Sequence, residues 1–271
     1  MADYVLARKS RNIASSAVHI LLNILLGVGA VLITVFSVNP ALGIILVLVS
    51  KWRVFAVRSR YLFINIKSSL VDIIVGLSIV LLTYYATIAH THMLSEPQDY
   101  IYAIVYMVIY IVWLLFIKPL SSEKANMAQS LIAVFLGSSA ATIMSATVDP
   151  ILATVLAFLV GYAACRHVMV QSDEEENFAL TTLACGLVFA EIAWLSHSWE
   201  IVYSFGRSGI RIPQAAIILT IFAFVYNYAR QAMVRYREDF RFKDIVGPVI
   251  FGVILIGIIV IFFSKPAFNI Y

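Results

Sequence analysis

The stretch AVLITVFSVNPALGIILVLV, residues 30–49, holds the feature on which the predicted fold depends. Two apolar runs meet at Asn39-Pro40 with no hydrophilic loop between them. The Asn-Pro pair favours a tight turn, because Asn bonds to its own backbone and Pro fixes φ. A chain that leaves an apolar run and enters another one at such a turn must return directly into the membrane. We therefore predict a transmembrane helical hairpin here.

The composition of the whole chain supports a membrane protein. Of its 271 residues, 62% are hydrophobic and only 13% are charged, and the mean hydropathy is +0.94. These values exclude a soluble globule, in which about a quarter of the residues are charged. A bilayer core of roughly 30 Å needs about 20 apolar residues per helix, so nine helices nearly use up the chain. We predict an all-α, polytopic helical bundle that forms a single transmembrane domain over residues 1–271. The nine predicted segments are 16–38, 40–58, 68–90, 100–118, 126–147, 150–169, 178–197, 212–230 and 245–264.

A second Asx-Pro turn indicates an internal repeat. Asp149-Pro150 lies 110 residues after Asn39-Pro40, and this offset superposes the first four predicted segments on the next four. We predict a tandem repeat, with unit one at 14–120, unit two at 124–230 and an additional helix at 245–264. Each unit has an even number of crossings, so the units are parallel. The alternative is that tight hairpins simply recur in polytopic proteins.

Small residues midway through segments 16–38 and 126–147 make these two helices the predicted central crossing.

The basic residues predict the orientation. With a cytoplasmic N-terminus, sixteen of the nineteen Lys and Arg residues face the cytoplasm, and only Arg207, Arg211 and Lys265 lie outside. This is the positive-inside pattern. We predict the cytoplasmic (inner) membrane of a prokaryote, with the C-terminus outside. The net charge of +4 does not indicate nucleic acid, because the bases lie in short loops. The two cysteines, Cys165 and Cys185, have no spacing typical of a disulfide framework or a zinc site.

Glu191 is the candidate for chemistry on the outer side. Ionisable residues within the membrane are costly and are functional candidates by default. The predicted repeat pairs the helix ends that carry His90, His92 and His197 near Glu191, where a proton or cation could bind. The alternative for Glu191 is a hydrogen bond to a neighbouring helix or contact with interfacial water. The three histidines are candidate metal ligands, but their spacing matches no ligand motif, so we predict no metal and no cofactor.

Two further groups could line a path for a solute or ion. His19 and Asn23 lie at i and i+4 near the start of the first segment, on one helix face. Tyr106 and Tyr110 belong to an aromatic stripe of the fourth segment. The alternatives are an interhelical hydrogen bond for the first pair and ordinary packing for the tyrosines.

Charged residues also gather on the predicted cytoplasmic side. A buried cation needs a partner, so we predict that Lys51 or Arg53 pairs with Asp72. Arg53, Arg60 and Lys67 recur every seven residues and share one face if the segment is helical. Such a face suits contact with lipid phosphates or with a phosphate-bearing lipid substrate. The alternative is positive-inside anchoring alone.

Three functions fit these observations. A transporter or channel for a small solute or ion is the first expectation and predicts a wet cavity that reaches Glu191. A non-catalytic membrane-complex or anchoring subunit is the second and predicts no functional cavity. A membrane-embedded enzyme acting on a phosphate-bearing lipid is the third and predicts acid, base and phosphate ligands near Arg53, Arg60 and Asp72. No P-loop, HExxH or GxSxG motif is present, so an enzyme is not favoured. The expected partners are the bilayer, anionic lipid headgroups and a second copy or another membrane protein.

Overall fold

The chain forms a bundle of long helices. The computed structural model describes residues 2–90, 100–170, 178–199, 201–205, 209–235 and 243–264. In chain order its helices are α1 (Ala2–Ser37), α2 (Pro40–Ser50), α3 (Trp52–Phe55), α4 (Ser59–His90), α5 (Ile101–Val112), the π-helical turn η2 (Trp113–Ile117), α6 (Glu123–Ser145), α7 (Pro150–Met169), α8 (Phe178–Ser196), the 3-10 turn η3 (His197–Trp199), α9 (Gln214–Arg235) and α10 (Lys243–Phe262). A short antiparallel pair of strands, β1 (Val202–Ser204) and β2 (Arg211–Pro213), precedes α9.

Both Asx-Pro turns form the predicted hairpins. The Asn39 side-chain oxygen accepts a hydrogen bond of 2.8 Å from the Ala41 backbone N–H. The Asp149 carboxylate accepts one of 2.7 Å from the Ile151 backbone N–H. In each turn a proline is the first residue of the following helix, where its missing N–H costs no helical hydrogen bond. The two turns are therefore built by the same local chemistry.

The apolar helices identify a multi-pass membrane protein. Six described helical stretches are long and apolar enough to cross a bilayer: Ser15–Ser37, Tyr61–Ala89, Glu123–Ser145, Pro150–Met169, Phe178–Ser196 and Ile245–Phe262. Two shorter apolar helices, Pro40–Ser50 and Ile101–Ile117, accompany them. The predicted segment 212–230 lies on α9, which is not among the six. The count of nine crossings therefore stays a prediction.

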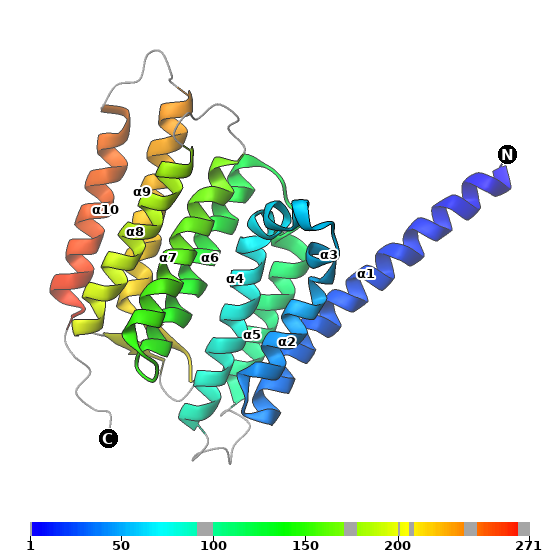
Figure 1. Ribbon diagram of the computed structural model, residues 1–271, viewed down its shortest axis with the longest axis horizontal. Coiled ribbons are helices and arrows are strands. Elements are labelled where there is room, and N and C mark those ends of the chain that lie inside the picture. Colours follow the sequence, from blue (N-terminus) through cyan, green and yellow to red (C-terminus); the bar gives the residue numbers. More distant parts are fainter. Residues whose placement is uncertain are drawn as a thin grey trace.

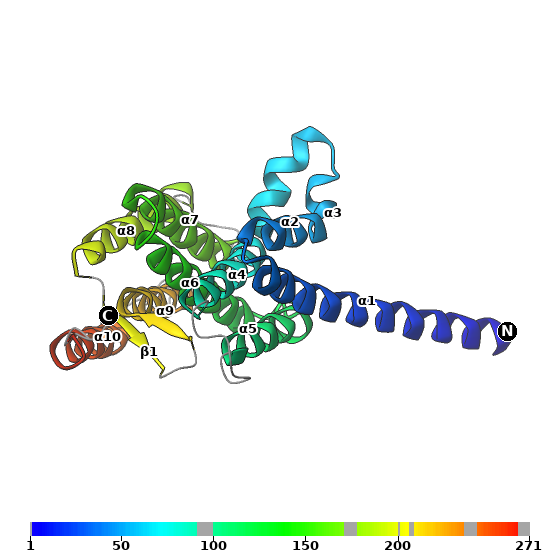
Figure 2. The ribbon, with the colours of Figure 1, turned by 90° about the horizontal axis from the view of Figure 1, so that it is seen from below.

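The centre of the bundle differs from the predicted one. Figure 1 shows the helices side by side, and α6 packs against α4, α7 and α9. By contrast, α1 packs against α2, α4 and α5, and its first turns extend away from the bundle (Figure 2). The prediction that segments 16–38 and 126–147 form the central crossing is therefore wrong. Gly137 of α6 lies instead beside Ile74 of α4 and Val160 of α7.

The helix pairings follow a similar order in the two predicted units. In the first, α1 packs on α2 and α5, and α2 packs on α4. In the second, α6 packs on α7 and α9, and α7 packs on α8. The corresponding helices differ in length, however, with 36 residues in α1 against 23 in α6, and 32 in α4 against 19 in α8. The repeat stays a prediction.

The predicted second segment, 40–58, is not one helix. Helix α2 ends at Ser50, α3 is a separate turn of four residues, and α4 begins at Ser59. Arg53 therefore lies on a different helix from Arg60 and Lys67, so the single helix on which these three residues were predicted to share a face does not form. The helix stops because the Lys51 backbone leaves helical geometry, with φ −97° and ψ 16°. We call this end of the bundle, where α2 and η2 finish and α6 begins, the basic end.

A glycine in α7 offers a test of the packing. A Cβ atom on Gly161 would lie 2.5 Å from Cγ and 2.7 Å from Cβ of Phe189 in α8, and these atoms are too close to the backbone to move freely. Overpacking of this kind costs about 1–3 kcal/mol. We expect Gly161→Ala to lower the thermal unfolding midpoint by several degrees in detergent micelles.

The matched control is Gly257→Ala in α10, where an added Cβ meets no atom within 4 Å. This variant should keep the wild-type midpoint or raise it slightly. Equal midpoints for the two variants would contradict the described packing of α7 on α8.

Candidate functional site

A cavity of about 420 Å³ lies at the basic end. Its volume falls in the range of about 300–1,000 Å³ that is typical of ligand sites. The walls come from α1, the region of α2 and α3, α4, η2, α6 and α7. The polar and charged lining residues are His19, Asn23, Ser50, Lys51, Arg53, Ser68, Ser69, Asp72, Trp113, Lys118, Gln129 and His167.

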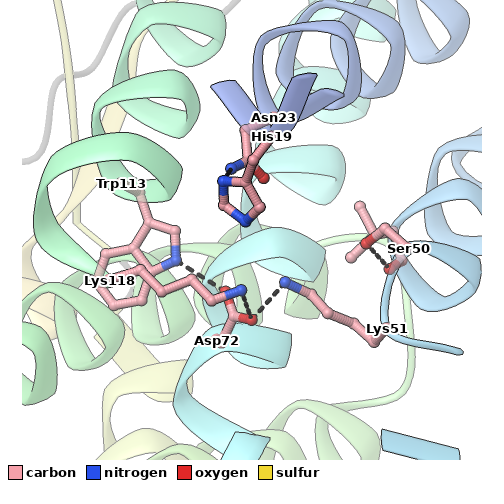
Figure 3. Close-up of polar contacts among 8 residues, drawn as sticks. His19, Asn23, Ser50, Lys51, Asp72, Trp113 and Lys118 are labelled. Atoms are coloured by element: carbon pink, nitrogen blue, oxygen red, sulfur yellow. Dashed lines mark hydrogen bonds and ion pairs between the residues drawn. The ribbon is translucent and has the colours of Figure 1, made fainter. Parts of the chain in front are cut away.

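Asp72 of α4 is the central residue of this cavity (Figure 3). One carboxylate oxygen, Oδ2, accepts from the Lys51 ammonium and lies 2.8 Å from the Lys118 ammonium. The other oxygen, Oδ1, accepts a hydrogen bond of 3.0 Å from the Trp113 indole N–H. The predicted ion pair of Asp72 is therefore confirmed, and its partner is Lys51 rather than Arg53. Because both oxygens are engaged, Asp72 holds its neighbours in place.

The π-helical turn explains how two residues of one segment reach Asp72. In an α-helix of about 3.6 residues per turn, positions five apart point about 140° away from each other. In η2 the Lys118 backbone N–H bonds instead to the Trp113 carbonyl at 2.9 Å, the i to i+5 bond of a π-helix. This wider turn brings Trp113 and Lys118 to the same side. The one additional residue in this turn therefore allows both Trp113 and Lys118 to contact Asp72.

His19 and Asn23 line the cavity from α1. The Asn23 amide nitrogen lies 3.1 Å from His19 Nδ1. An amide nitrogen can only donate, so Nδ1 accepts and the neutral imidazole carries its proton on Nε2. In Figure 3 this second ring nitrogen points toward Lys51 and Asp72. The structure therefore brings His19 and Asn23 together within one helix, and not by the interhelical hydrogen bond that was the alternative.

His167 of α7 lines the cavity with a defined tautomer. The Gln129 side-chain nitrogen donates to the carbonyls of Ile117 and Leu120, at 2.8 and 2.9 Å. These two bonds fix the orientation of the Gln129 amide. Its oxygen therefore faces His167 and accepts a hydrogen bond of 2.7 Å from His167 Nε2. The neutral imidazole then keeps its lone pair on Nδ1. His167 is thus the one lining group described here that offers a free basic nitrogen.

The cavity carries an excess of positive charge. Lys51, Arg53 and Lys118 supply three positive charges, and Asp72 supplies one negative charge. The Lys51 side chain is only 5% exposed, so water screens it weakly. Each ammonium group has three donors, so an Asp72 bond leaves donors for a ligand. The arrangement can bind an anion that carries several oxygen acceptors.

The predicted outer site has no comparable enclosure. Glu191 and His197 are both exposed, and neither lines the two larger cavities described, of about 420 and 300 Å³. The side chain of His90 and the whole of His92 lie outside the described residues. Within the described ranges, no three His, Cys, Asp or Glu side chains lie close enough to hold a metal ion.

The tyrosines of the predicted path lie in the core. Tyr106 and Tyr110 are 5% and 0% exposed and belong to the main hydrophobic cluster. The Tyr110 ring approaches Gly76, where a Cβ atom would meet its hydroxyl at 2.9 Å. Their burial in the core agrees with the alternative considered from the sequence, in which the tyrosines pack between helices and do not line a path. Lys67 is exposed on α4 and does not line the basic cavity, whereas Arg53 does.

Sequence reasoning missed four of the cavity residues: Trp113, Lys118, Gln129 and His167. A buried indole N–H needs an acceptor, and Asp72 is the carboxylate of the same end, so this need was the available signal for Trp113. Lys118 was counted only among the basic residues of the cytoplasmic side, and Gln129 and His167 were not considered. No signal in the sequence indicates the π-helical turn that brings Lys118 to Asp72.

The charge cluster predicts a large effect of Asp72→Asn. The amide keeps the shape of the carboxylate but leaves the buried Lys51 ammonium without a counter-charge, which typically costs about 3–5 kcal/mol. We expect a corresponding fall in the free energy of unfolding, measured by denaturant titration in mixed micelles. The double variant Lys51→Met/Asp72→Asn should recover part of the loss.

The control is Lys67→Gln, which removes an exposed charge and should change the stability by less than about 0.5 kcal/mol. An Asp72→Asn variant as stable as wild type would show that the ion pair does not hold the site together.

The chain matches no protein-family model, no curated protein and no solved structure. Its function is therefore argued from the chemistry of the basic cavity.

Proposed function

We propose that this membrane protein binds a phosphate-bearing anion in the cavity at the basic end. The observation that carries the proposal is the pair of ammonium groups, Lys51 and Lys118, held on one carboxylate oxygen of Asp72 inside a cavity that Arg53 also lines. Asp72 fixes the lysines but neutralises only one of the three cations. The remaining two charges match a phosphate group, which carries one to two negative charges.

The hydrogen-bonding pattern supports phosphate over a halide or a single carboxylate. Phosphate oxygens accept several charge-assisted hydrogen bonds at once, and a guanidinium binds them in a fork. The donors available are the ammonium groups, the Arg53 guanidinium and the His19 Nε2–H. Because these come from separate elements, α1, α3 and η2 among them, an anion with oxygens on several sides contacts them best.

The surroundings favour a lipid as the source of the phosphate. Trp52 and Phe55 of α3 and Phe63 of α4 are 63%, 42% and 72% exposed. Exposed aromatic side chains beside the basic residues Arg53 and Lys67 are typical of an element that lies at the membrane–water interface. A lipid headgroup at this interface would lie next to α3, which forms part of the cavity wall. A soluble phosphate compound is the other source of the same chemistry.

This proposal corresponds to the third function considered from the sequence, without its catalytic step. The acid that an enzyme would need is engaged in ion pairs, while His167 Nδ1 remains as a base. Transport through Glu191 stays a prediction without a described cavity to support it. The alternative of an anchoring subunit would use α10. This helix contacts mainly α9, so its other side can face a second membrane protein.

The proposal includes an orientation in the membrane. We propose nine crossings in the cytoplasmic membrane of a prokaryote, with the basic end and the N-terminus in the cytoplasm. Successive long helices of the bundle run in alternating directions (Figure 1), as expected of a chain that crosses the membrane several times. The tandem four-helix units are part of the same proposal.

Binding can be measured on the purified protein in nanodiscs. In one arm phosphatidylglycerol is titrated into phosphatidylcholine nanodiscs, and in the other arm inorganic phosphate or pyrophosphate is added to the solution. We expect the lipid arm to saturate, and Lys118→Gln or Arg53→Gln to weaken binding about tenfold each, the equivalent of about 1.4 kcal/mol per lost charge-assisted bond. Saturation in the soluble arm alone would identify a soluble ligand.

Lys67→Gln is the matched control, because this base is exposed and lies outside the cavity lining. It should leave the affinity unchanged. Equal weakening by Lys67→Gln and Lys118→Gln would indicate surface attraction only and would contradict a cavity site. No saturable binding in either arm would also contradict it.

The orientation has its own test. A reporter fused after Tyr271 should behave as external, and one fused within the loop between η2 and α6 should behave as cytoplasmic. A cytoplasmic signal from the C-terminal fusion would contradict nine crossings.

A further inference from the structure

A second cluster of reactive side chains lies between α7, α8 and α9, separate from the basic cavity. Cys165 and Met169 lie one turn apart on α7, and their sulfur atoms are 3.5 Å apart. Cys185 of α8 belongs to the same buried cluster as these two residues. The Tyr226 hydroxyl of α9 lies 3.3 Å from the Cys165 sulfur and 3.6 Å from the Met169 sulfur.

A small cavity accompanies the cluster. It measures about 10 Å³ and is lined by Cys165, Cys185, Tyr226 and Asn227 among others. Met169 is not part of this lining, but its sulfur lies 3.5 Å from that of Cys165. This volume is close to the smallest that holds one water molecule, about 10–15 Å³, so a single ion is a suitable occupant. Asn227 is 1% exposed, and its side-chain nitrogen has no hydrogen-bond partner in the part of the chain that the structure describes. A buried donor without an acceptor is costly, and Cys165 and Cys185, which line the same cavity, can supply an acceptor as thiolates.

We propose that Cys165, Cys185 and Met169 bind a copper(I) ion. Thiolate and thioether sulfurs are soft ligands, which select Cu(I) over the harder divalent ions. Zinc is disfavoured, because its sites use thiolate, imidazole or carboxylate in a closed set of four.

The separation of the Cys165 and Met169 sulfurs suits a three-coordinate site. With metal–sulfur bonds of about 2.3 Å, three sulfurs in a trigonal arrangement lie about 4 Å apart. The Cys165 and Met169 sulfurs therefore need to separate by only about half an ångström. Met169 can make this adjustment because its side chain is unbranched and flexible.

The surrounding charges and donors support bound thiolates. Metal binding displaces the two thiol protons, so the site with Cu(I) has a net charge of −1. The Arg230 guanidinium of α9 donates to the Val168 carbonyl at 3.0 Å, so a positive charge lies beside the turn of α7 that carries Cys165 and Met169. The orphaned Asn227 N–H gains an acceptor, because a thiolate accepts far better than a thiol. Outer groups of this kind strengthen metal binding.

The test uses the full chain, purified anaerobically in detergent and kept reduced. Cu(I) is titrated against a chromogenic Cu(I) chelator, and bound metal is examined by X-ray absorption. We expect one Cu(I) per chain and two to three sulfur neighbours at about 2.3 Å. Cys165→Ser and Cys185→Ser should each weaken the affinity by more than about 100-fold, beyond the loss seen for outer-shell residues. Met169→Leu should weaken it about tenfold.

The matched control is Met144→Leu, which changes a buried methionine of α6 away from the cluster. It should leave the affinity unchanged. Folding of each variant is checked by its thermal midpoint without metal, which separates loss of a ligand from loss of structure. The proposal is overturned if the folded wild type binds no Cu(I), if both Cys→Ser variants bind as tightly as wild type, or if the two cysteines prove to form a disulfide in the anaerobic protein.

Discussion

The basic end of the molecule depends on one buried carboxylate. Asp72 joins α4 to the end of α2 through Lys51 and to η2 through Trp113 and Lys118. A charge at this depth is expensive unless each of its lone pairs is used. Both oxygens of Asp72 are used, and the partners come from segments far apart in the sequence. The carboxylate therefore fixes the positions of the cations and, with them, the wall of the cavity.

The helix α7 connects this cavity to the rest of the bundle. His167 faces Gln129 and the cavity, whereas Cys165 and Met169 lie on the side of α8 and α9. The Ser130 hydroxyl donates to the Ala164 carbonyl at 3.1 Å, so α6 and α7 are held together at the same level. The same turn of α7 carries His167 of the basic cavity and Cys165 and Met169 of the sulfur cluster. We therefore expect that a structural change at one of these two sites shifts the other through the packing of α6 against α7.

The sequence allowed the features with a local or an obligatory cause to be predicted. The hairpin at Asn39 follows from the residues of the turn itself, and the pairing of Lys51 with Asp72 follows because a buried charge needs a partner. The single helix on which Arg53, Arg60 and Lys67 were predicted to share a face does not form, because α3 ends at Phe55 and α4 begins at Ser59, although the pattern of apolar residues continues there. Lys118 at Asp72 could not be predicted, since one additional residue in the π-helical turn changes the direction of the side chain.

The distance between a lysine nitrogen of the basic cavity and a phosphorus atom tests the proposed site most directly. Solid-state NMR can measure it in bilayers that contain phosphatidylglycerol, from the dipolar coupling between ¹⁵N-labelled lysine and ³¹P. With a charge-assisted N···O distance of about 2.8 Å, the account predicts a nitrogen–phosphorus distance of about 4 Å. The short distance should be found for the buried Lys51 as well as for Lys118. A protein in which neither of these two lysine nitrogens lies within about 6 Å of phosphorus would contradict a phosphate in the cavity.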